Sequence, residues 1–184
     1  MLIALIIVGV VIVVVIAMYN GLVRLKVQCD NAWSDIDVQL KRRYDLIPNL
    51  VETVKGYAGH EKETLEGVIA ARNQAISATG PAAKAGAENM LTGALRQLFA
   101  VAEAYPDLKA STNFQQLQAE LTDLENKIAA ARRFFNNAVG EYNASIQRFP
   151  AVLIAGAAGF QPREFFDVGA DRAALQSAPQ VKFS

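Results

Sequence analysis

The chain has 184 residues, and its 18 Lys and Arg side chains balance its 18 Asp and Glu side chains. A net charge of zero argues against a nucleic-acid partner, because phosphate binding requires a surplus of basic residues on one face. The single cysteine, Cys29, excludes an intrachain disulfide, and we interpret it as a small apolar residue on a helix. The residues behind an apolar N-terminal segment suffice for one domain with its own core.

The N-terminal segment is almost purely apolar, and no charged side chain precedes Arg24. A helix needs about 20 apolar residues to cross the ~30 Å hydrocarbon core of a bilayer, and residues 1–22 supply that length. A cleaved signal peptide is the alternative, but the segment lacks the basic start and the small-residue cleavage site of such peptides. We therefore expect residues 1–22 to be a transmembrane anchor in the lipid bilayer, with Tyr19 at the interface.

The charges that flank the anchor predict its direction. No Lys or Arg precedes it, whereas Arg24 and Lys26 follow it closely and a further basic cluster occupies positions 41–43. Basic residues beside a transmembrane helix stay on the cytoplasmic side. We expect a single-pass protein with its N-terminus outside and its domain in the cytoplasm.

Behind the anchor, apolar residues recur every three or four positions, which is typical of helices that pack in a coiled-coil-like seam. Gly and Pro residues interrupt this pattern at positions where helices commonly end. The pattern predicts helices over about 23–58, 60–78, 82–104 and 112–149. Pro48 lies inside the first of them, where we expect a kink or a split near Ile47.

Helix lengths and short connections predict an all-α fold, with the anchor followed by an antiparallel four-helix bundle over residues 23–149. The first and fourth helices are long and the second and third are shorter. The part nearest the membrane is then a helix pair that cannot cover all its own apolar faces. Either the tail or a second copy of the chain is expected to cover them. The candidate interaction surface comprises Trp33, Asp35, Val38, Arg43, Arg132, Phe134, Asn136 and Val139, of which Asp35, Arg43, Arg132 and Asn136 are expected to be paired.

The tail, residues 150–184, is rich in Gly and Pro, and we expect it to be irregular and to lie near the membrane end of the bundle. It begins with a short apolar run that is too short to span a bilayer. This run either lies in the lipid interface or packs on the base of the long helices. Its candidate membrane-proximal residues are Val152, Leu153, Ile154 and Phe160.

Three long stretches resemble the signature of the LemA family: NAWSDIDVQLKRRYDLIPNLVETVKGY at residues 31–57, AEAYPDLK at 102–109 and ENKIAAARRFFNNAVGEYN at 125–143. Phe149-Pro150, Gly159-Phe160 and a closing Val181–Phe183 also fit. At Phe134-Phe135 the family usually has an aromatic residue followed by tyrosine. The resemblance implies a bacterial inner-membrane or plasma-membrane protein with an N-terminal anchor and a helical domain. It implies no biochemical activity.

The sequence contains no clear catalytic or metal-binding motif. The only histidine, His60, is followed by Glu-Lys-Glu-Thr, so the zinc motif with a second histidine is missing and a di-iron bundle is excluded. Cys29 and His60 are too far apart along one helix to form a catalytic pair. We expect no enzyme activity, no cofactor and no metal site. The leading hypothesis is a scaffold that forms a homo-oligomer through its long helices. The alternatives are an adaptor in envelope signalling or stress response that binds an unidentified protein, and a membrane-shaping protein.

Overall fold

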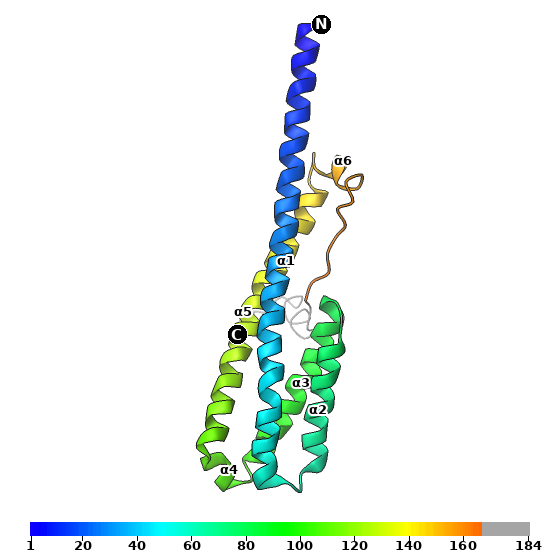
Figure 1. Ribbon diagram of the computed structural model, residues 1–184. Helices are drawn as coiled ribbons and strands as arrows, with labels where there is room; N and C mark the ends of the chain where they lie inside the picture. Colours follow the sequence, from blue (N-terminus) through cyan, green and yellow to red (C-terminus); the bar gives the residue numbers. More distant parts are fainter. Residues whose placement is uncertain (167–184) are drawn as a thin grey trace, which may run out of the picture. The chain divides into compact units, whose positions relative to one another are not determined.

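The computed structural model describes residues 1–166 and is helical almost throughout that range (Figure 1). Helix accounts for 84% of these residues, which contain no strand, so the all-α prediction is confirmed. The tail beyond residue 166, with the motif Val181–Phe183, lies outside the described residues. The helices are α1 (Leu2–Ala58), α2 (Lys62–Ser77), α3 (Pro81–Ala102), α4 (Pro106–Ala110), α5 (Thr112–Gln147) and α6 (Val152–Ala155).

Helix α1 joins the expected anchor and the first expected domain helix into one helix of 57 residues. Residues 1–17 are all exposed, and this part of α1 is long and apolar enough to cross a membrane. Burial begins at Leu22, which is 4% exposed. Pro48 costs α1 a backbone hydrogen bond but does not split it, because Ile47 and Leu50 beside it are fully buried and hold the helix in place.

The shorter helices begin and end near the Gly and Pro residues at which the sequence predicts helix ends. Gly80 precedes α3 with φ +82°, a conformation that favours glycine, and Pro81 then occupies the first turn, where its missing N–H is not needed. Pro106, expected only to end the third helix, also begins the five-residue helix α4. The observed ends of α2, α3 and α5 lie within about two residues of those that the pattern predicts.

The chain divides into two compact units, and the division crosses both long helices. The first unit contains Met1–Asp37 and Ala130–Phe165, and the second contains Val38–Ala129 and, among the described residues, Phe166. The expected boundaries at residues 22 and 149, which separate anchor, bundle and tail, stay a prediction. Helix α1 leaves the first unit only after it has paired with the second half of α5.

In the first unit, the paired parts of α1 and α5 form the core. Cys29 and Val139 are fully buried, and Phe135 and Tyr142 are almost so. The ring of Trp33 lies 5.3 Å from the ring of Phe135. Burial raises the pKa of the Cys29 thiol, which keeps it protonated as the small apolar residue that the sequence suggests.

In the second unit, α2 and α3 lie side by side, next to parts of α1 and α5. The apolar residues that the spacing assigns to the seams of the long helices are buried here, which confirms that part of the pattern. On α2, the buried residues are Leu65, Val68 and the smaller Ala71 and Ala75, while Ile76 is 46% exposed. The buried seam residues are Leu40, Tyr44, Ile47, Val51, Val54 and Ala58 on α1, and Phe114, Leu117, Leu121, Leu124 and Ile128 on α5.

Candidate functional site

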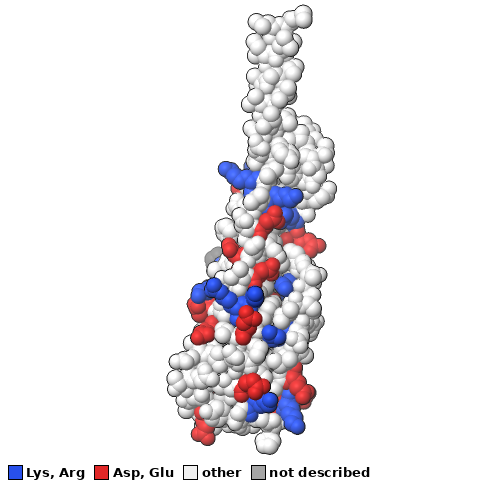
Figure 2. Space-filling model, viewed as in Figure 1, with Lys and Arg blue, Asp and Glu red and all other residues white. Residues whose placement is uncertain are grey.

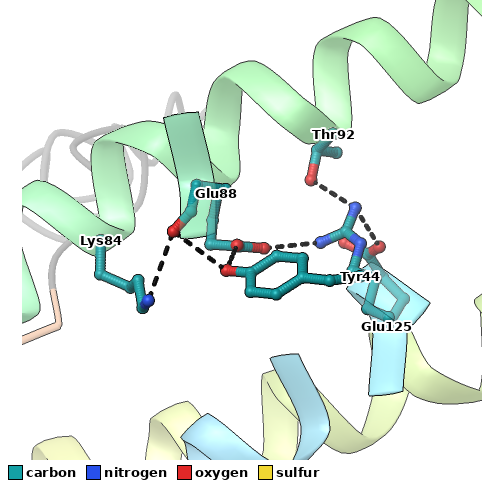
Figure 3. Close-up of polar contacts among 7 residues, drawn as sticks. Tyr44, Lys84, Glu88, Thr92 and Glu125 are labelled. Atoms are coloured by element: carbon teal, nitrogen blue, oxygen red, sulfur yellow. Dashed lines mark hydrogen bonds and ion pairs between the residues drawn. The ribbon is translucent and has the colours of Figure 1, made fainter. Parts of the chain in front are cut away.

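A buried polar network lies in the core of the second unit, between α1, α3 and α5 (Figure 3). The Arg43 guanidinium on α1 donates to the Glu88 carboxylate on α3 over 3.0 Å and to the Thr92 hydroxyl over 2.9 Å. It also lies 3.2 Å from the carboxylate of Glu125 on α5. Arg43 and Glu88 are only 2% and 5% exposed. One arginine therefore ties three helices together.

A second set of contacts surrounds Tyr44, the neighbour of Arg43. Its hydroxyl donates to the other Glu88 carboxylate oxygen and approaches the Ala75 carbonyl of α2 at 3.4 Å. Arg72 of α2 donates from Nε to the Tyr44 carbonyl over 2.7 Å. Lys84 of α3 donates to the Ala75 carbonyl over 3.3 Å. The network thus reaches α2, and each of its side chains contacts another helix, although the buried Arg43 Nε itself has no hydrogen-bond partner.

The charge state of Glu88 reflects two opposing influences. Burial raises the pKa of this carboxyl group above its ordinary value, and this effect outweighs the Tyr44 hydrogen bond and the nearby Arg43 and Lys84 charges, which lower it. Glu88 therefore binds a proton more readily in the folded chain than in the unfolded chain.

The sequence does contain a signal for this network, although its residues are polar. Arg43 continues the 3–4 spacing of the buried positions 36, 40, 47, 50 and 54, and Glu88 continues that of 91, 95, 98 and 102. Polar side chains in seam register predict a buried pair. The expectation that Arg43 is paired is confirmed, whereas Glu88, Tyr44 and Thr92 were not expected to take part.

The arrangement is better suited to fixing helix positions than to catalysis. A hollow of about 250 Å³ lies beside Arg43, Thr92 and Glu125, with Leu95 and Leu121 in its wall. The Arg43 N–H groups that face Thr92 and Glu125 are already bonded to these two side chains. Among residues 1–166, no three His, Cys, Asp or Glu side chains gather closely enough to hold a metal ion. We interpret the network as a device that fixes the register of the helices.

The predicted interaction surface on the long helices is only partly exposed. Phe134 is 51% exposed and Val38 is 48% exposed, as that prediction requires. Asp35 is exposed, whereas Arg132 and Asn136 are half-buried and each has an interaction partner.

Two members of that surface do not fit it. Val139 is fully buried, so its expected incomplete burial was wrong: it packs inside the α1–α5 pair. Arg43 belongs to the buried network and is not open to a partner. Trp33 lies between these cases, half-buried against Phe135.

The apolar run after α5 splits into a buried part and an exposed part. The Phe160 ring is buried and lies 5.6 Å from the Tyr19 ring of α1 in an edge-on arrangement. Ile154 is half-buried, but Leu153 is 69% exposed and Val152 is 47% exposed. Phe149, the last residue of the helix expected over 112–149, is 76% exposed because α5 ends at Gln147.

Two hydrogen bonds and one ion pair hold the chain that follows this run against the helix pair. Asn143 of α5 bonds with both backbone groups of Arg163, donating to its carbonyl over 2.9 Å and accepting from its N–H over 2.8 Å. The Arg163 guanidinium lies 2.7 Å from the Asp30 carboxylate of α1. The run from 149 to 160 is therefore held next to the part of α1 around Tyr19.

Comparisons with known proteins place these features in a family context. The model of the LemA family matches residues 32–183. Magnetosome protein MamQ of Magnetospirillum gryphiswaldense is 26% identical over 174 residues, which cover 80% of this chain and 64% of that protein. Magnetosome protein MamQ 2 of Paramagnetospirillum magneticum matches to the same extent. Protein LemA of Metamycoplasma hominis is 29% identical over 168 residues, covering 86% of this chain and 75% of that protein. The matched region spans less than two-thirds of the length of the magnetosome relatives.

Proposed function

We propose that this chain, which belongs to the LemA family, is a non-enzymatic, membrane-anchored scaffold that associates with copies of itself through its long helices. The observation that carries the proposal is the exposure of large apolar side chains on those helices outside the anchor. Val27 and Val38 are both 48% exposed, and Phe134 on α5 is 51% exposed. Eleven residues make about three helical turns, so Val27 and Val38 lie on one face of α1. Such residues favour burial by a partner.

The proposal includes an antiparallel four-helix bundle with long first and fourth helices. The lengths support it, because α1 and α5 have 57 and 36 residues while α2 and α3 have 16 and 22. The network around Arg43 also supports it, since bonds from α1 reach α2, α3 and α5. The first unit contains only two long helices, which leaves it with more apolar surface than it can cover.

The anchor itself contributes little to the proposed assembly. Transmembrane helices that pair closely often do so through a Gly-x-x-x-Gly motif, and residues 1–22 contain none. Their small residues spaced four apart are Ala17 and Gly21, which lie at the very end of the apolar run. We therefore place the contact between copies on the helices outside the membrane.

The size of the full chain in detergent micelles tests this proposal. Light scattering after gel filtration is expected to give an oligomer for the wild type and a smaller species for Phe134→Asp, because a charge replaces the apolar contact. Asn137→Asp places the same charge at another exposed position of α5, where no large apolar side chain is lost; it is the control and should leave the size unchanged. A monomer at every protein concentration would contradict self-association.

Crosslinking of the same sample in membranes separates the scaffold from the adaptor. Crosslinks that join two copies through α1 and α5 support the scaffold. A dominant crosslink to a different protein supports an adaptor in envelope signalling or stress response instead.

We also propose that the protein lies in the bacterial inner or plasma membrane with its N-terminus outside and its domain in the cytoplasm. The basic residues Arg24 and Lys26, which directly follow the apolar part of α1, support this direction. Protease added to intact spheroplasts is expected to leave the domain undigested, and detergent permeabilisation should then expose it. Digestion of the domain in intact spheroplasts would reverse the proposed direction.

A further inference from the structure

The turn that follows α5 exposes apolar side chains that no part of the described chain covers. Phe149 is 76% exposed, Leu153 is 69% exposed and Val152 is 47% exposed. The other side of the same turn is packed, since Ala155 and Phe160 are buried. A short segment that buries one side and exposes large apolar groups on the other is amphipathic and favours an apolar surface. We call residues 149–160 the apolar turn.

The apolar turn lies beside the part of α1 at which the anchor ends. A hollow of about 280 Å³ has Leu22 and Leu25 of α1 on one wall and Phe149 and Pro150 on the other. At the far end of the turn, Phe160 contacts Tyr19. Both ends of the turn are therefore level with residues 19–25 of α1.

The length of the anchor places that level at the lipid surface. Leu2–Leu22 forms a helix about 31 Å long at about 1.5 Å per residue, which matches the ~30 Å hydrocarbon core. Tyr19 then lies close to the boundary between acyl chains and headgroups. The apolar turn beside it lies at the same boundary, where exposed Phe and Leu side chains are stabilised by contact with lipid.

Basic side chains lie beside the turn: Arg24 and Arg148 line the same hollow as Phe149, as does the acidic Glu141. Arg24, Lys26 and Arg148 are exposed. Figure 2 shows basic side chains gathered where the uncharged N-terminal segment meets the charged part of the molecule. Basic groups just outside an apolar insertion attract anionic lipid headgroups near the surface of the membrane.

We propose that the apolar turn is a second, shallow membrane contact, inserted through Phe149, Val152 and Leu153 into the leaflet that α1 leaves. This inference rests on the membrane anchor of the proposed function and adds a second attachment point to it. Two contacts restrict the tilt and rotation of the first unit relative to the bilayer, which one helix alone does not do.

Depth-dependent fluorescence quenching tests this contact in the full chain. Trp33 is the only tryptophan, so a Trp33→Phe background permits a single reporter at Leu153→Trp. The protein is reconstituted into vesicles whose phospholipids carry bromine either close to the headgroup or in the middle of the acyl chain. We expect Leu153→Trp to be quenched several-fold more strongly by the shallow bromine than by the deep one.

Two further positions provide the matched controls. Ile12→Trp in the anchor should be quenched most by the deep bromine, and Asn137→Trp on the exposed side of α5 should be quenched by neither. If Ile12→Trp is quenched while Leu153→Trp, like Asn137→Trp, is quenched by neither bromine, the proposed second contact is wrong but the membrane anchor is supported. If Ile12→Trp is not quenched, the anchor is wrong, and the inference is overturned with it.

A cysteine version avoids the loss of the Trp33–Phe135 contact. In a Cys29→Ala background, an environment-sensitive fluorophore is attached at Leu153→Cys, Ile12→Cys or Asn137→Cys. A blue-shifted emission at position 153 relative to position 137 supports lipid contact. The same emission at both positions would contradict it.

Discussion

Replacing Arg43 with methionine is expected to lower the free energy of unfolding by about 3 kcal/mol. The substitution leaves the Glu88 carboxyl group buried without its cation, at 5% exposure, while the Tyr44 hydrogen bond remains. Breaking a buried ion pair typically costs about 3–5 kcal/mol, and we expect the lower end because Glu88 can take up a proton. Urea unfolding of the full chain in detergent, followed by circular dichroism, measures the change.

Two further variants show whether the charge pair or the packing is responsible. Arg42→Met removes the neighbouring exposed arginine and should change stability by less than about 0.5 kcal/mol. The double variant Arg43→Met/Glu88→Leu replaces both buried charges with apolar groups and should recover most of the lost stability. A double variant that is less stable than Arg43→Met would show that Glu88 has a role independent of Arg43.

The loss in the free energy of unfolding that Arg43→Met causes should also depend on pH. A carboxyl group whose pKa is raised in the folded state contributes stability that is fully present below its unfolded value, 4.5, and is lost as the pH rises through its folded value. Without Arg43, which lowers this pKa, the folded value rises further. The difference between wild type and variant is therefore expected to narrow as the pH falls from neutral towards 4.5. A pH-independent difference would assign the loss to packing.

Replacing Phe135 with alanine is expected to destabilise the first unit by about 3–5 kcal/mol. The ring is 2% exposed and lies against Trp33, so its removal opens a cavity in a core built from only two long helices. Such a core has few neighbouring side chains that can shift to fill the space. Trp33, the only tryptophan, reports the unfolding of this unit directly through its fluorescence.

Phe134→Ala provides the control for this prediction, because it removes the same ring from the adjacent residue. At 51% exposure it should change the free energy of unfolding by less than about 1 kcal/mol when the chain is dilute enough to be monomeric. The Trp33 emission should shift to the red in folded Phe135→Ala and stay unchanged in Phe134→Ala. Equal losses in both variants would contradict the observed division between a buried and an exposed face.

Much of the helical framework could be predicted from the sequence, because helix formation depends on neighbours three or four residues apart. The spacing that assigns Ile47, Leu121 and Phe135 to buried faces is visible without any tertiary information, and all three are buried. The candidate interaction surface was less predictable. Val139 lies one residue from the seam position Ala138, and the pattern alone does not show that both are buried.

By itself, the sequence determined the apolar helix at the N-terminus and the amphipathic helices behind it, since length, composition and period are local properties. Only the tertiary structure decided which polar groups are buried and which apolar groups are exposed. Glu88 is buried because a guanidinium 45 residues away in the chain meets it across the core. Phe149 is exposed because α5 ends before it, at Gln147, and the turn that follows leaves the ring uncovered. Both outcomes depend on contacts between segments far apart in the chain, which a local pattern does not contain.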